Sequence, residues 1–97
     1  MPKPLRVLLI EDNLDDVVLV RQTLRDAAPH DFEIESATRL EDGLRLLKEQ
    51  SFDIVLLDLT LPDSFGIETY DRLHSLSDVP VVVLSGDTND EVALVAL

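Results

Sequence analysis

The chain has 97 residues, and its 20 acidic and 8 basic side chains give a formal net charge of −12. This length allows one small domain, and 45% hydrophobic with 29% charged residues is typical of a globular chain. The charge disfavours contact with nucleic acid or an anionic membrane surface, because such contacts depend on Lys and Arg. Cys is absent, which excludes disulfides, thiolate nucleophiles and Cys-based zinc sites. No apolar run approaches the ~20 residues of a membrane span, and we expect a cytoplasmic protein without a signal peptide.

The first half of the chain predicts two strands and two helices in alternation. Residues 6–10 form a short apolar run that is typical of a strand buried on both faces. A helix is predicted over residues 14–27, with acidic side chains in its first turn. Residues 32–36 alternate apolar and polar, which favours an edge strand. The spacing that starts at Thr38 matches a capping box and predicts a second helix to residue 49.

The second half continues the alternation. Residues 53–58 are the most apolar strand signal and are expected in the middle of a parallel sheet. Residues 61–66 have the composition of a turn, and a short helix is predicted over residues 67–74. Residues 79–84 predict a fourth strand, and a second capping-box spacing predicts a helix over residues 88–97. Strands separated by helices indicate one α/β domain with a parallel sheet.

Three carboxylates are expected to meet at the carboxyl edge of this sheet. Glu11 and Asp12 follow the first predicted strand, and Asp58 ends the third. In such sheets the loops at the carboxyl ends of the strands form the site. Carboxylates within about 4–6 Å repel by roughly 4 kcal/mol per close pair at an effective dielectric constant near 20. The cluster therefore needs a proton or a cation, and oxygen ligands without Cys or a nearby His favour Mg²⁺ or Mn²⁺ over zinc.

Hydrogen-bond donors are expected beside the acids. Ser85 and Gly86 follow the fourth predicted strand. The Ser85 hydroxyl and the backbone N–H groups around Thr60 and Gly86 could donate to an anion held against a metal ion. Acids, a hydroxyl and a metal together suit phosphoryl chemistry.

Four stretches in this order resemble the receiver domain of two-component response regulators. They are LLIEDN at residues 8–13, DIVLLD at 53–58, LPDSFG at 61–66 and VVLSG at 82–86. The similarity covers the whole chain and implies a single receiver domain over residues 1–97. It also implies a flavodoxin-like open parallel sheet with strand order 2-1-3-4.

The resemblance implies a role for each matching residue. Asp58 would be the phosphoacceptor and would form an aspartyl phosphate. Asp12, Asp58 and the backbone carbonyl of Thr60 would bind Mg²⁺ (or Mn²⁺), and Glu11 would act through a water molecule.

Four further residues receive roles from the same resemblance. Ser85 and Gly86 would contact the phosphoryl group, and the movement of Ser85 would report phosphorylation to the surface. Pro62 and Gly66 would shape the loop that follows the phosphoacceptor.

The chain departs from the family pattern at its C-terminal end. Family members continue through a fifth strand, which carries a lysine that contacts the phosphoryl oxygens, and through a last helix. Neither follows before Leu97. We therefore expect a domain that is incomplete at this end, with a possible output domain beyond it. The fourth strand would then be an unpaired sheet edge, which together with the largely apolar segment 91–97 predicts self-association or segment exchange between chains.

Three functions remain open from the sequence. The first is a receiver that takes a phosphoryl group from a histidine kinase or phosphotransfer domain, controls a partner or output domain, and catalyses at most its own phosphorylation and dephosphorylation. The second is an interaction module that works without phosphorylation. The third is a phosphatase similar to the haloacid dehalogenases, which is disfavoured because those enzymes place a second Asp where this chain has Thr60.

Overall fold

The fold is described by a computed structural model that covers residues 4–26, 31–88 and 91–96, with side chains described as far as Leu84. Its main sheet has five strands: β1 Leu5–Ile10, β2 Phe32–Ala37, β3 Ile54–Asp58, β6 Val81–Thr88 and β7 Glu91–Ala96. Three helices connect them: α1 Leu14–Arg25, α2 Leu40–Glu49 and α3 Ile67–His74. A small hairpin of β4 Thr60–Leu61 and β5 Ser64–Phe65 follows β3. None of the helices in this described part is long and apolar enough to cross a bilayer.

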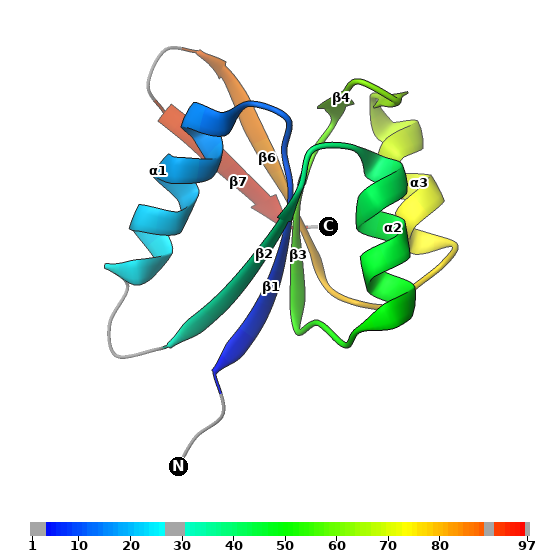
Figure 1. The fold of residues 1–97 in the computed structure, drawn as a ribbon. Coiled ribbons are helices and arrows are strands. Elements are labelled where there is room, and N and C mark those ends of the chain that lie inside the picture. The colour runs from blue at the N-terminus through cyan, green and yellow to red at the C-terminus, as the bar shows by residue number, and fades with distance from the viewer. Residues whose placement is uncertain (1–3, 27–30, 89–90, 97) are drawn as a thin grey trace.

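The main sheet is parallel over its first four strands. Their order, β2-β1-β3-β6, confirms the order that the family resemblance implies, with β7 added at the end. Figure 1 shows α1 on one face of the sheet and α2 and α3 on the other. Because successive strand residues point to opposite faces, Leu8 and Ile10 pack in one core cluster, whereas Val7 and Leu9 pack in another with Val17 of α1. β1 is thus buried on both faces, as predicted.

Two of the helices begin where the sequence predicted them. The side chain of Asn13 caps α1 by accepting hydrogen bonds from the N–H groups of Asp15 (2.9 Å) and Asp16 (3.4 Å). The helix was predicted to reach residue 27, which lies outside the described residues, and it ends at Arg25. α3 covers the predicted residues 67–74.

The predicted capping box at the start of α2 is wrong. The N-cap residue of α2 is Arg39 and makes no side-chain capping bond. The first N–H groups of the helix instead bind the carboxylate of Asp63, in the loop after β3. The cap is therefore supplied by tertiary structure, which the local spacing of Thr38 and Glu41 does not reveal.

The predicted helix over residues 88–97 is also wrong. Residues 91–96 form β7, which pairs antiparallel with β6. A helix this short is marginal by itself, whereas a strand satisfies the backbone groups along the outer edge of β6. The β-branched Val92 and Val95 favour the strand as well.

This pairing changes two further expectations. The fourth strand is not an unpaired edge, because β7 pairs with it from Val82 to Thr88. The strand also runs beyond its predicted end at residue 84, so Ser85 and Gly86 lie within β6 rather than after it.

Helix α2 approaches β1 very closely at Gly43. A Cβ atom at this position would lie 2.4 Å from Cδ1 and 2.8 Å from Cγ1 of Ile10. Ile10 is fully buried in the core, so a larger residue at position 43 would force the Ile10 side chain or α2 to shift.

We expect Gly43→Ala to lower the free energy of unfolding by about 1 kcal/mol, because overpacking costs about 1–3 kcal/mol and better helix propensity returns about 1 kcal/mol. Urea denaturation measures the change. In an Ile10→Val background, which lacks the Cδ1 atom, Gly43→Ala should cost less or become stabilising. An equal loss in both backgrounds would contradict the close approach.

Candidate functional site

The predicted acids meet at the carboxyl edge of the central strands. Glu11 and Asp12 directly follow β1, and Asp58 is the last residue of β3. These two strands are parallel neighbours, with Ile10 beside Leu57, so their carboxyl ends lie at the same edge (Figure 1). One carboxylate oxygen from each acid lies within 4.8 Å of the others. The cluster is therefore compact enough for all three acids to share one proton or one cation.

The three acids differ in exposure. Glu11 is buried, with 4% of its surface exposed, whereas Asp58 is half-buried and Asp12 is exposed. Backbone groups hold two of them: the Asn13 N–H donates to Oε1 of Glu11 at 3.0 Å, and the Thr60 N–H donates to Oδ1 of Asp58 at 3.0 Å. Because Asn13 also caps α1, the start of this helix fixes the position of Glu11.

The burial of Glu11 and the negative charge beside it change the pKa of this residue. Burial raises the pKa of Glu11 from 4.5 to about 8. The N–H of Asn13 opposes this rise, while the hydrogen bond and charge of Asp58, and a hydrogen bond to Asp12, add to it. Near neutral pH the Glu11 carboxyl is therefore largely protonated unless a cation offsets the negative charge. An all-oxygen donor set of this kind fits Mg²⁺ or Mn²⁺.

The loop after Asp58 forms the β4–β5 hairpin. Thr60 pairs with Phe65, so the predicted metal-binding carbonyl of Thr60 belongs to this hairpin. Pro62 lies at its tip, between the paired residues Leu61 and Ser64. Gly66 closes the hairpin with a φ of 74°, which favours glycine, and its N–H donates to the Leu59 carbonyl at 2.6 Å.

Ser85 and Gly86 are placed by the backbone of β6. Leu84 is the register partner of Asp58 across the β3–β6 pair, so Ser85 is the next residue along the strand. Ser85 pairs with Ala93 on the other side, and the β6–β7 register is irregular between Ser85 and Thr88. Backbone pairing thus brings position 85 to the edge where Asp58 lies.

Asp63 is a residue of the site region that the sequence reasoning missed. Its Oδ1 accepts the N–H of Leu40 at 2.8 Å, and its Oδ2 accepts the N–H of Glu41 at 2.9 Å. Desolvation raises the pKa of Asp63, but hydrogen bonds from the Glu41 and Leu40 N–H groups outweigh it and leave the pKa below its ordinary value. The sequence signal is an Asp after Pro62 in a turn, which does not indicate its partner.

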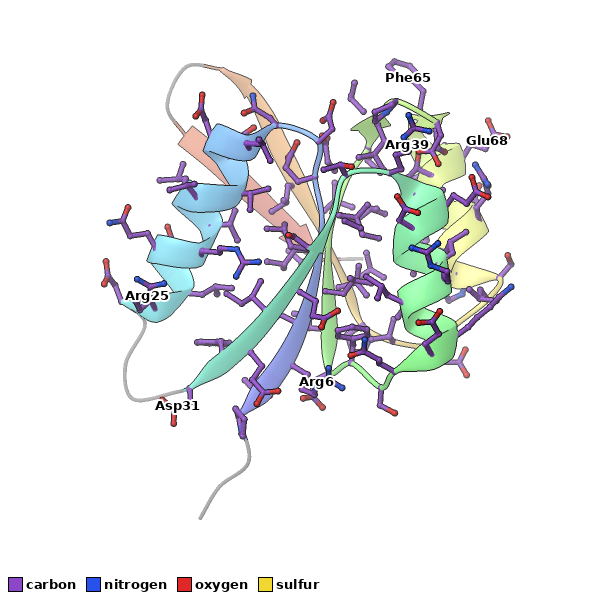
Figure 2. All side chains as sticks on the ribbon, viewed as in Figure 1. Arg6, Arg25, Asp31, Arg39, Phe65 and Glu68 are labelled. Atoms are coloured by element: carbon purple, nitrogen blue, oxygen red, sulfur yellow. The ribbon has the colours of Figure 1, made fainter. Side chains whose placement is uncertain are left out.

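Described basic residues lie at both ends of the folded molecule. Lys48 lies in the last turn of α2, away from the acids. Arg39, at the start of α2, lies at the same end of the molecule as Phe65, whereas Arg6 and Asp31 lie at the opposite end (Figure 2). Arg39 therefore approaches the carboxyl edge from the segment that follows β2.

The shifted pKa of Glu11 predicts a pH dependence of stability. A carboxyl group whose pKa is raised by folding stabilises the native state fully below pH 4.5, and this contribution is lost as the pH rises to about 8. With divalent cations removed by a chelator, we expect urea denaturation to show a loss of up to about 1.4 kcal/mol per pH unit across this window.

The matched control is Glu11→Gln, which keeps the shape of the side chain and cannot ionise. Its stability should change much less over the same pH range. Parallel pH profiles for the two proteins would contradict the assignment of the proton to Glu11.

Comparison with known proteins identifies the family. A model of the response regulator receiver domain matches residues 7–97. The chain is 36% identical over 92 residues to the KDP operon transcriptional regulatory protein KdpE of Escherichia coli. This alignment covers 94% of this chain and 39% of that protein. It is 32% identical over 100 residues to protein-glutamate methylesterase/protein-glutamine glutaminase 2 of Paramagnetospirillum magneticum, covering 100% of this chain and 27% of that protein.

A solved structure agrees with these relatives. The MaeR response regulator bound to beryllium trifluoride superimposes with a TM-score of 0.75 at 27% identity, covering 88% of this chain and 70% of that one. The chain spans well under half the length of the two curated relatives. With the parallel sheet and the acidic cluster at its carboxyl edge, these matches show that the chain belongs to the response regulator receiver domain family of two-component systems.

Proposed function

We propose that this chain accepts a phosphoryl group on Asp58 from a histidine kinase or phosphotransfer domain and changes conformation to control a partner or output domain. The observation that carries the proposal is the compact group of Glu11, Asp12 and Asp58, whose carboxylate oxygens lie within 4.8 Å of one another. Such a group suits phosphoryl transfer, in which charge stabilisation and positioning supply most of the catalysis.

Exposure favours Asp58 over Glu11 as the nucleophile. A phosphodonor has to reach the attacking oxygen, and Asp58 is half-buried at a strand end, whereas Glu11 is almost completely covered. The Thr60 N–H orients one oxygen of Asp58. Asp12 is more exposed than Asp58, so the orienting hydrogen bond from Thr60, rather than exposure, favours Asp58 over Asp12.

The proposed reaction moves one phosphoryl group. A carboxylate oxygen of Asp58 forms a bond to phosphorus, the P–N bond to the donor histidine breaks, and the histidine nitrogen keeps the electron pair. Attack of water on phosphorus later breaks the P–O bond, releases inorganic phosphate and restores the carboxylate. We propose that the chemistry of this chain is limited to gaining and losing this group.

Four residues are proposed to hold Mg²⁺ or Mn²⁺. Asp12, Asp58 and the Thr60 carbonyl would bind the ion directly, and Glu11 would bind it through water. When bound, the ion would offset the negative charge of the carboxylates and the phosphoryl oxygens. Because the pKa of Glu11 is raised in the metal-free cluster, ion binding should release protons.

The remaining site residues would respond to the phosphoryl group or shape its surroundings. Ser85 is proposed to hydrogen-bond the phosphoryl oxygens and, with Gly86, to transmit the change along β6. Support comes from the register, in which Ser85 follows the partner of Asp58. Pro62 and Gly66 would maintain the hairpin that carries Thr60.

Exposed apolar side chains at this end suit a docking partner. Leu14 and Val18 of α1 are 68% and 61% exposed, and Phe65 and Ile67 beside the hairpin are 74% and 60% exposed. Phe65 projects from the end of the molecule (Figure 2). We propose that a cytoplasmic histidine kinase or phosphotransfer domain covers such side chains, and that an output domain, rather than nucleic acid, is the other partner of this domain.

Self-association stays a prediction, but the strand that would mediate it is a different one. Since β6 is paired, the outermost strand on this side of the described sheet is β7. Pairing between chains would therefore involve β7 rather than the exposed fourth strand or a C-terminal helix.

A second candidate is an interaction module that works without phosphorylation. It is favoured by the side chains that the structure describes, among which Lys48 is the only lysine. Lys48 lies in the last turn of α2 rather than at the carboxyl edge.

Intact mass spectrometry after incubation with acetyl phosphate and Mg²⁺ separates these candidates. We expect a mass increase of one phosphoryl group that Asp58→Asn abolishes, because the amide is a much weaker nucleophile. Asp53→Asn, directly before the other end of the same strand, should keep the adduct. The absence of an adduct in the unmodified chain would contradict the proposal and favour the interaction module.

A further inference from the structure

We propose that Asp63 is a positioning residue for the phosphoryl-accepting site. Through its two hydrogen bonds to the start of α2, it would fix the hairpin that carries Thr60 and so couple the metal affinity of the site to this helix. The inference rests on the proposed function, because it concerns the same metal and the same acceptor.

The tip of the hairpin is bound to the start of α2 through the carboxylate of Asp63. Each oxygen of Asp63 accepts one backbone N–H, from Leu40 and from Glu41, at 2.8 and 2.9 Å. The residue that precedes the helix makes no side-chain cap. The start of α2 therefore depends on Asp63, and Asp63 is held in two directions by the helix.

The near end of the hairpin touches the acceptor. Thr60 donates its N–H to Asp58, and its carbonyl is the proposed metal ligand. Only two residues separate Thr60 from Asp63 in the sequence. Since the chain advances at most about 3.6 Å per residue, Asp63 stays close to Thr60, and the pairing within the hairpin decides whether a shift at Asp63 reaches Thr60.

The segment between the two ends is stiff. Thr60 pairs with Phe65, and Leu61 pairs with Ser64. Leu61 is buried in the same core cluster as Leu40. The Ser64 hydroxyl lies 2.8 Å from that of the fully buried Thr69 in α3. The hairpin thus moves as a unit rather than absorbing a shift at its tip.

Helix α2 is itself anchored beside the acids. Gly43 lets the helix lie directly against Ile10, the residue that precedes Glu11. The helix therefore contacts β1 next to one proposed metal-binding acid and, through Asp63, holds the loop of the other. Because binding linkage is reciprocal, Mg²⁺ at the site should in turn stabilise the start of α2.

The first test is Mg²⁺ binding by titration calorimetry, at a temperature where circular dichroism shows every variant folded. We expect Asp63→Ala to weaken Mg²⁺ binding about fivefold or more. Asp63→Asn, which keeps one acceptor, should fall between Asp63→Ala and the unmodified chain. Glu41→Gln also removes one negative charge, at the first turn of α2, but it keeps the carboxylate of Asp63. This variant should bind Mg²⁺ as the unmodified chain does.

The second test needs no change at position 63. Hydrogen exchange of the Leu40 and Glu41 amides should slow when Mg²⁺ is added, and this effect should vanish in Asp58→Asn. Equal Mg²⁺ affinity in Asp63→Ala and the unmodified chain, an equal loss in Glu41→Gln, or amide exchange that is insensitive to Mg²⁺ would each overturn the role of Asp63. Failure of the unmodified chain to bind Mg²⁺ would instead overturn the proposed function itself.

Discussion

The site depends on the meeting of three carboxylates at one edge of a parallel sheet. Their mutual repulsion and the burial of Glu11 both oppose folding, and the raised pKa of Glu11 is the direct sign of this cost. Two backbone N–H groups, from Asn13 and Thr60, reduce the cost by donating to the acids. The arrangement is unfavourable without a bound proton or cation, and it is therefore well suited to respond to one.

The central strands make this arrangement possible. β1 and β3 are neighbours in the middle of the sheet and are buried by helices on both faces. Their apolar side chains supply the stabilisation that the polar edge lacks, since burial of an aliphatic side chain contributes about 1.5–3 kcal/mol. Short buried strands with acids directly at their ends thus combine a rigid scaffold with a charged site.

The sequence predicted those parts of the molecule that depend on local pattern. The buried runs of β1 and β3 and the extent of α3 follow from hydrophobic periodicity and turn composition. The order of the parallel strands was implied by the resemblance to a known family, and the structure confirms it. The convergence of Glu11, Asp12 and Asp58 follows from topology once the strand order is known. The wrong predictions concern segments whose structure depends on contacts with residues distant in the sequence. Residues 91–96 became a strand because β6 offered an edge to pair with.

The start of α2 is a second place where a distant residue, rather than the local sequence pattern, determines the structure. Thr38 and Glu41 have the spacing of a capping box, yet the N–H groups that such a box would satisfy are taken by Asp63, which lies 23 residues beyond Leu40 in the chain. A carboxylate that accepts two N–H groups at a helix start satisfies them better than one hydroxyl does, so the tertiary cap prevails over the local one. The same hairpin carries Thr60, whose N–H donates to Asp58, so the residue that caps the helix and the residue that contacts the proposed acceptor belong to one short segment.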